Sequence, residues 1–180
     1  MRTPNKPRSL SRRILELVLF AMLGATMFAT RTAMAVLPNI HPLAMFIMVC
    51  TIVFRVRALI PLYLYVMLEG LFWGFSPWWY PYLYIWTILW GLTMLLPKGM
   101  SKKAKCVVYP VVCAFHGIMF GVLYAPAEAI LYKMSWEKTL LWIVRGIPFD
   151  LLHCFGDFCM GLLVFPLSEL LIKLLKRLGD

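Results

Sequence analysis

Charged residues are scarce in this chain. Asp, Glu, Lys and Arg together make up 14% of its 180 residues, whereas hydrophobic residues make up 62% and the mean hydropathy is +0.81. A water-soluble domain normally has roughly a quarter of its residues charged. The shortage excludes a domain folded around a core in water, and it predicts an all-α protein that uses lipid as its solvent.

The sequence also lacks the motifs of several common enzyme sites. It contains no GxxxxGK[ST] phosphate loop, no HExxH and no GxSxG. We therefore expect no catalytic residue and no cofactor, and the chain is predicted not to be an enzyme. Its five cysteines form no CxxC pair, and we interpret them as small residues buried in helices rather than as a disulfide framework or zinc site. They are Cys50, Cys106, Cys113, Cys154 and Cys159.

Long apolar runs are what the chain has in abundance. A bilayer core of about 30 Å takes about 20 helical residues to cross, so the length allows about six spans with short loops. The segment 136–145 mixes Trp with Glu, Lys and Arg and is interpreted as interfacial. The whole chain, 1–180, is then predicted to be one membrane domain, a bundle of six transmembrane helices. The expected spans are 14–35, 42–54, 58–75, 82–97, 106–130 and 148–172.

Basic residues are divided unequally between the two sides of such a bundle. Fourteen Lys and Arg residues fall on the side of the termini and four on the other side. The positive-inside rule therefore predicts cytoplasmic termini, with residues 1–13 as a basic tail. Since the basic clusters are short and lie between apolar runs, the net charge of +10 is interpreted as a topology signal and not as a nucleic-acid-binding surface. The sequence AMA at 33–35 also fits a signal-peptide cleavage site, but the apolar run before it is long for that role.

The stretch GIPFDLLHCFGDF, residues 146–158, places three ionisable groups in the last predicted span. Asp150, His153 and Asp157 share one helical face within an arc of roughly 60°. Groups this costly in hydrocarbon persist where they face protein, water or a ligand, so all three are candidate substrate-binding residues. His153 and Asp157 have the spacing of two metal ligands one turn apart. No third ligand has convincing spacing, so we expect no metal site.

Further candidates lie near the ends of the spans that are predicted to face outward. Residues 73–86 hold eight aromatic residues, which form either an interfacial belt or a surface for stacking and cation–π contacts. Arg31 either neutralises a carboxylate or binds an acidic group of a ligand, and His116 is expected to be a packed, hydrogen-bonded histidine. The additional candidate substrate-binding residues are Arg31, Asn39, His41, Glu69, Trp73, Trp78, Trp79, Tyr84, Trp86, Tyr124 and Glu128.

Small residues form a stripe along the first predicted span. Ala21, Ala25, Ala29 and Ala33 recur every four residues and cover an arc of roughly 120°. Because lipid provides no hydrophobic drive for helix association, small residues at this spacing favour close packing of another helix. We expect Gly70/Gly74 and Gly117/Gly121 to pack within the bundle, and the alanine stripe to be a docking face for another membrane protein.

These features together resemble the substrate-binding S components of energy-coupling-factor (ECF) transporters, which are small six-helix bacterial membrane proteins. The resemblance covers essentially the whole chain and rests on Ala21, Ala25 and Ala29, on LPNIHP at 37–42, and on PFDLLHCFGDF at 148–158. The family often has an Asp–His–Gly–Asn pattern in the last of these segments, where this chain has Asp157 in place of Asn.

The resemblance implies a multi-pass protein of the bacterial cell membrane. Its alanine face would meet a transmembrane T component linked to two cytoplasmic ATPases, and its ligand would lie near the outer ends of the last three helices, under the loop after the first. His153 and Asp157 match positions that often help to bind substrate. The expected substrate is a vitamin-like aromatic heterocycle with an amine, such as a thiamine-like compound or queuine or queuosine. The alternatives are an intramembrane hydrolase and a membrane scaffold protein.

Overall fold

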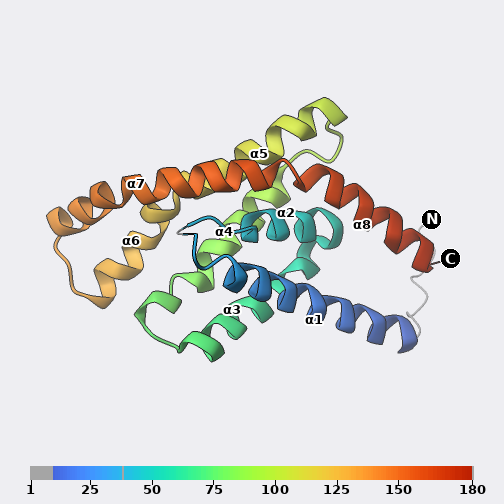
Figure 1. Cartoon of the computed structure of the whole chain (residues 1–180), viewed down its shortest axis with the longest axis horizontal. Coiled ribbons are helices and arrows are strands. Elements are labelled where there is room, and N and C mark those ends of the chain that lie inside the picture. Colours follow the sequence, from blue (N-terminus) through green and yellow to red (C-terminus); the bar gives the residue numbers. More distant parts are fainter. Residues whose placement is uncertain (1–9, 38, 180) are drawn as a thin grey trace, which may run out of the picture.

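The computed structural model describes residues 10–37 and 39–179, and these residues contain helices and no strand. The first nine residues of the predicted basic tail lie outside this range. Figure 1 shows a long molecule in which the start of α1 and the end of α8 lie at the same end. The helices are α1 (Leu10–Ala33), α2 (Leu43–Phe54), η1 (Arg55–Ala58), α3 (Leu59–Trp73), η2 (Pro77–Trp79), α4 (Tyr82–Leu95), α5 (Lys102–Ile118), α6 (Phe120–Leu131), α7 (Trp136–Gly161) and α8 (Val164–Gly179).

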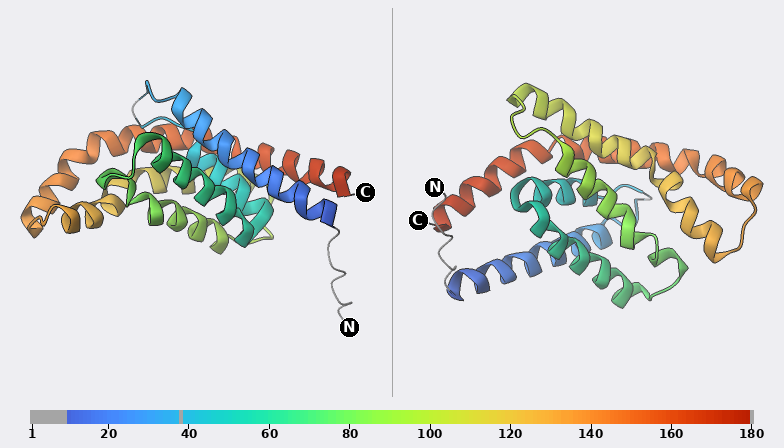
Figure 2. Two further views of the ribbon diagram at one scale, coloured as in Figure 1. Left: turned by 90° about the horizontal axis from the view of Figure 1, so that it is seen from below. Right: turned by 180° about the vertical axis from the view of Figure 1, so that it is seen from behind.

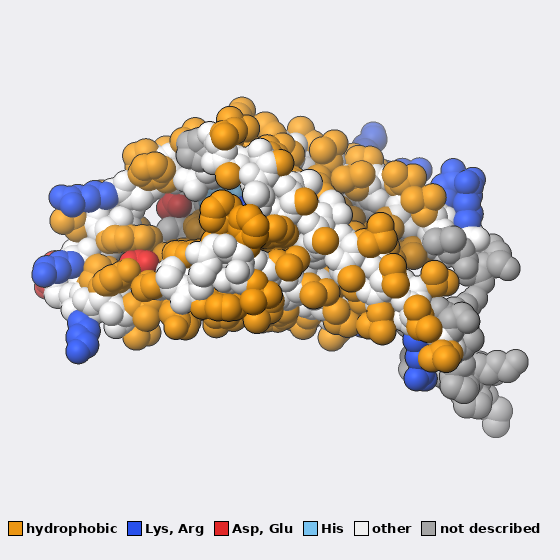
Figure 3. Space-filling model, turned by 60° about the horizontal axis from the view of Figure 1, so that its bottom comes forward, with side chains coloured by type: hydrophobic (Ala, Val, Ile, Leu, Met, Phe, Trp, Pro, Cys, Tyr) orange, Lys and Arg blue, Asp and Glu red, His pale blue; other side chains and the backbone are white. Residues whose placement is uncertain are grey.

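Three helical segments are long and apolar enough to cross a membrane. They are Arg13–Ala33, Leu43–Trp73 and Lys102–Leu131, and the bent pair α7 and α8 would make a fourth. The chain is therefore compatible with a membrane protein, as its composition indicates. Figure 3 agrees: on the face it draws, Lys and Arg side chains gather at the two ends of the long axis, with hydrophobic side chains between them.

The α2 helix forms the centre of the molecule. Eight of its twelve residues are buried, and it packs against α4, α8 and α7. A helix that is hydrophobic all round is expected in such an interior position. It ends at Arg55, whose φ of 56° and ψ of −123° interrupt the helix before η1 and α3. Figures 1 and 2 show α3 lying beside α1, on one side of this central helix.

The segment interpreted as interfacial is continuous with the start of the last predicted span. Residues 136–145 belong to α7, which continues from Trp136 through Pro148 to Gly161. Its real break comes later, where α7 and α8 meet at an angle of 42°. Pro166 lies just beyond that break and has no N–H to donate to the carbonyl of residue 162, which explains the bend. Pro148, at which the last span was predicted to begin, lies inside α7 and does not end it.

The predicted span 106–130 is divided into α5 and α6 at Met119. Asp150 explains the division, because its Oδ1 accepts the backbone N–H of Gly121 at 3.0 Å. In an unbroken helix this N–H would bond to the carbonyl four residues earlier. A side chain of α7 thus enters the hydrogen-bond ladder of the neighbouring helix and bends it.

Three of the four glycine expectations are confirmed and one is wrong. A Cβ on Gly117 would lie 2.9 Å from the backbone N of Cys154, and a Cβ on Gly121 would lie 2.3 Å from Asp150 Oδ2, so both allow α7 to approach closely. Gly70 packs under Phe75 in the loop that follows α3. Gly74 has no neighbour within 4 Å; it ends α3 with a φ of +91°, a conformation that L side chains rarely adopt.

The expectation of five buried cysteines is only half right. Cys50 and Cys113 are buried and Cys154 is half-buried, but Cys106 and Cys159 are exposed. All five are free thiols, as the absence of a disulfide framework predicts. The two exposed residues lie on outward faces of α5 and α7. These faces are apolar, so the hydropathy of the sequence does not distinguish them from buried faces.

The close approach of α5 and α7 provides a test of the packing. Replacing Gly117 with alanine is expected to lower the free energy of unfolding by about 1–3 kcal/mol, because the added methyl group would overlap α7 backbone. Gly91 in α4 is the matched control. It has open space around it, so Gly91→Ala is expected to be neutral or to add about 0.5–1 kcal/mol. Thermal unfolding in detergent would measure the stability of both variants. An equal change in stability for the two would contradict the close packing of α5 on α7 at Gly117.

Candidate functional site

A cavity of about 270 Å³ lies beneath the loop that joins α1 to α2. The loop and the end of α1 form one side of the cavity, and α4, α6 and α7 contribute one residue each to the other sides. The volume suits a small organic molecule rather than a polymer. The lining residues are Arg31, Met34, Ala35, Leu37, Asn39, His41, Tyr82, Phe120 and His153.

The loop is held against α7 at two points. The Asn39 side chain donates a hydrogen bond of 3.4 Å to the carbonyl of Phe149, and its φ of 58° is one that asparagine adopts more readily than most residues. Ile40 lies over Gly156, where a Cβ would come within 3.3 Å of its Cγ1. These contacts bring His41 next to His153, with ring centroids 5.0 Å apart and planes almost perpendicular.

The α7 side of the site is unusually polar for a buried surface. His153 is 2% exposed and Asp157 is 0% exposed. His153 Nε2 and both carboxylate oxygens of Asp157 have no hydrogen-bond partner among the described residues, and neither does His41 Nδ1. Buried polar atoms normally have partners, so a group of unpaired ones beside a cavity points to a missing ligand or ion.

The loop histidine has a defined charge state. His41 lies between α1 and α2, where burial, together with the charge of Arg31, lowers the pKa of its imidazole to about 4. The ring is therefore neutral at pH 7, and one of its nitrogens is free to accept a hydrogen bond or bind an ion.

Aromatic rings form the wall between the cavity and the core. Trp86 is fully buried, with its ring centroid 6.1 Å from that of His41 and 5.6 Å from that of Phe120. The ring centroid of Tyr82 lies 5.7 Å from that of Trp86. His116 lies behind this wall and its Nε2 is 3.1 Å from the carbonyl of Ile85, which confirms the expected packed, hydrogen-bonded histidine.

An ion pair lies at the edge of the cavity. Arg31 Nη1 is 3.5 Å from Glu69 Oε2; the arginine side chain is 24% exposed and the glutamate is 0% exposed. Of the two roles considered for Arg31, the structure shows the neutralisation of a carboxylate. The same arginine also lines a shallower hollow of about 290 Å³ with Ala35, Trp73 and Trp78, which places these two tryptophans on the outer side of α1 rather than in the main cavity.

Five predicted site residues lie away from the cavity and have other contacts. Trp79 Nε1 donates to the carbonyl of Val66 at 2.8 Å, and Tyr84 donates to that of Leu123 at 2.6 Å. Tyr124 donates to the carbonyl of Trp78 and stacks on Trp142. Asp150 binds the Gly121 N–H, and Glu128 is half-buried near the end of α6. The contacts of Trp79, Tyr84, Tyr124 and Asp150 therefore hold helices and loops together.

Sequence reasoning missed three of the loop residues that line the cavity, and it missed the two aromatic lining residues Tyr82 and Phe120. Met34, Ala35 and Leu37 carry no chemical signal, and only the fold brings them to the site. Tyr82 belongs to the aromatic segment 73–86, so its type was noticed but not its position. Phe120 was masked by the uniform hydrophobicity of the span in which it lies.

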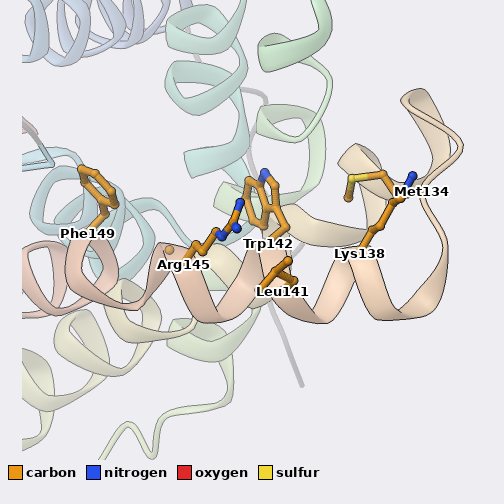
Figure 4. Close-up of a pocket in the computed structure, with 7 residues that line it drawn as sticks. Met134, Lys138, Leu141, Trp142, Arg145 and Phe149 are labelled. Carbon is orange, nitrogen blue, oxygen red and sulfur yellow. The ribbon is translucent and has the colours of Figure 1, made fainter.

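A second hollow, larger than this cavity, lies along the first part of α7. It measures about 430 Å³ and is lined by Met134, Lys138, Leu141, Trp142, Arg145, Gly146 and Phe149. Figure 4 shows the labelled side chains from Lys138 to Phe149 along one stretch of α7, and Met134 on the connection that precedes it. Its two cations are exposed, in contrast to the buried polar groups of the smaller cavity.

The alanine stripe is on the surface. Ala21, Ala25, Ala29 and Ala33 are all exposed, whereas Gly24 and Met27 on the other face of α1 are buried against the rest of the protein. The α1 helix packs on α3 through that buried face. The stripe is thus free for contact with lipid or with another protein.

Comparison with known proteins adds no relative. A scan against protein-family models and searches of curated proteins and of solved structures find no match to this chain.

Proposed function

We propose that the chain is the substrate-capturing S component of an ECF-type importer in the bacterial cell membrane. In this proposal it crosses the membrane six times, has both termini in the cytoplasm, and binds a vitamin-like molecule from outside. A T component and two cytoplasmic ATPases would supply the energy, and the chain itself would catalyse no reaction.

The cavity beneath the α1–α2 loop is the observation that carries the proposal. A small, partly open cavity with aromatic walls and a few convergent polar groups is typical of a solute site. Among the described residues of the loop, the Asn39 side chain bonds to α7 and Ile40 packs on Gly156, and we propose that the loop forms a movable cover. A solute site with a movable cover on one side fits capture better than structural support.

The arrangement of charge supports the proposed orientation. The start of α1, the connection from α4 to α5 and the end of α8 lie toward one end of the molecule, and the connection from α6 to α7 lies at the other (Figure 1). The first group carries most of the basic residues, among them Lys102, Lys103, Lys176 and Arg177. By the positive-inside rule that end would face the cytoplasm.

The expected solute is a flat heterocycle that stacks on the rings of Tyr82 and Phe120, both of which line the cavity. An amine on it stays a prediction. Glu69 is paired with Arg31, and neither Glu128 nor Asp157 lines the cavity, but an Asp157 oxygen lies within 4.8 Å of ring nitrogens of the lining residues His41 and His153, so Asp157 is the carboxylate we propose for the amine. Thiamine-like compounds and deazaguanines such as queuine remain the candidates.

Native mass spectrometry of the full chain purified in mild detergent tests the proposal. We expect one small organic molecule per chain, and we expect coexpressed T component and ATPases to copurify with it. The replacement Tyr82→Ala is expected to lose the molecule, while Tyr63→Ala, on an exposed face of α3, is expected to retain it. A chain that neither retains a solute nor assembles with the ATPase module would contradict the proposal.

A further inference from the structure

Two histidines and a carboxylate meet on the α7 side of the cavity. One ring nitrogen of His41, one of His153 and one carboxylate oxygen of Asp157 all lie within 4.8 Å of one another. His153 and Asp157 are one turn apart on α7 and share a face. His41 comes from the α1–α2 loop, so the third member of the group joins the other two only in the folded chain.

The separations are close to those of a metal-binding site. Ligand atoms about 2.0–2.2 Å from a tetrahedral metal ion are roughly 3.3 Å from one another, so small side-chain rotations would bring these three into range. The polar atoms of the group are also unpaired: His41 Nδ1, His153 Nε2 and both Asp157 oxygens have no hydrogen-bond partner in the part of the chain that the structure describes. A bound ion would satisfy them.

The surrounding charges also favour a cation at this position. Asp157 is fully buried, and no cationic side chain among the described residues forms a salt bridge with it. Arg31 is the nearest cation on the cavity wall, and its charge is balanced by Glu69 at 3.5 Å. A dication would therefore neutralise a buried carboxylate that otherwise has no counterion, which offsets the cost of its burial.

We infer that His41, His153 and Asp157 bind a divalent first-row transition-metal ion, such as Zn²⁺ or Co²⁺. Two imidazoles and one carboxylate suit these ions, whereas Ca²⁺ and Mg²⁺ prefer sites made of oxygen atoms. Three protein ligands leave a fourth position open, as in zinc sites that bind a further molecule. Because His41 and His153 both line the cavity, a donor atom of a molecule in the cavity, or a water, would fill that position.

Titration of the full chain with Co²⁺ tests this site. The protein would carry a non-histidine affinity tag, be treated with EDTA, and be reconstituted in detergent free of chelator. We expect one Co²⁺ per chain, with the visible absorption of a four-coordinate ion and displacement by Zn²⁺. Fewer than a tenth of the chains loaded at saturating Co²⁺ would overturn the inference.

Matched substitutions identify the ligands. Asp157→Asn is expected to weaken Co²⁺ binding at least about 100-fold, since even outer-shell changes cost 10- to 100-fold. Asp150→Asn makes the same change on the same helix, keeps an oxygen for the Gly121 N–H, and is expected to bind as the parent does. His41→Gln lies in the loop, so its expected loss of affinity does not depend on the packing of α7. Parent-like Co²⁺ binding by both Asp157→Asn and His41→Gln would overturn the assignment.

The result is separable from the proposed function. If Co²⁺ binds and the ATPase module does not assemble, the metal site stands and the importer is wrong. If an organic solute and the ATPase module are found while Co²⁺ does not bind, the importer stands and the metal site is wrong.

Discussion

Replacing Ala25 with tryptophan is expected to leave the chain folded and to abolish its copurification with a T component and ATPases. Ala25 lies within the exposed stripe on α1, and small residues there let the backbone of another helix approach closely. An indole would hold the helices apart. Overpacking of this kind costs about 1–3 kcal/mol per site, which corresponds to a loss of about 5- to 150-fold in affinity.

A second tryptophan variant serves as the control for this result. Val107 is 63% exposed and lies on α5, a different helix from the one that carries the stripe. Val107→Trp is therefore expected to face lipid and to copurify with the module as the parent does. Coexpression and pull-down, with thermal unfolding of each isolated variant, would measure the effect. If Ala25→Trp assembles as well as Val107→Trp, the stripe faces lipid and not a partner.

Loss of Arg31 is expected to destabilise the protein strongly. In Arg31→Gln the Glu69 carboxylate would remain fully buried without its counterion. Breaking a buried pair in this way costs about 3–5 kcal/mol, and since the Arg31 side chain is 24% exposed we expect about 2–3 kcal/mol here. The reduction in the free energy of unfolding would be measured by denaturation in detergent.

The double variant separates the ion pair from other roles of the arginine. Adding Glu69→Gln to Arg31→Gln removes the uncompensated charge, so most of the lost stability is expected to return. Lys105→Gln breaks a pair whose carboxylate, Glu169, is 54% exposed, and it is expected to cost less than about 1 kcal/mol. A double variant as unstable as Arg31→Gln alone would contradict the role assigned to the pair.

The helices could be predicted well because hydropathy is a local property. The segments 42–54, 58–75 and 82–97 match the helices α2, α3 and α4 to within a few residues. As membrane spans they were not separated in the same way, because α2 and α3 lie in one segment long enough to cross a membrane and α4 lies in none. The errors came where two distant parts of the chain interact. The break between α5 and α6 depends on the Asp150 side chain of α7, so it could not be predicted from residues 106–130 alone.

The candidate site could be predicted only in part. Arg31, Asn39, His41 and His153 line the cavity as expected, while Tyr84, Tyr124, Glu128 and Asp150 do not. The sequence indicates how far along a helix a polar residue lies. It does not indicate which way that face turns, because the rotation of each helix is set by the helices packed against it.

Scarcity of charge and long hydrophobic runs act without any long-range contact, so they were enough to predict a helical protein rich enough in apolar segments for a membrane. Helical periodicity was enough to place His153 and Asp157 on one face. The pairing of Glu69 with Arg31, and the meeting of His41 with His153 and Asp157, could be seen only in the folded chain. Those encounters depend on how the α1–α2 loop lies over Gly156 and how α1 packs on α3, which are properties of the whole fold.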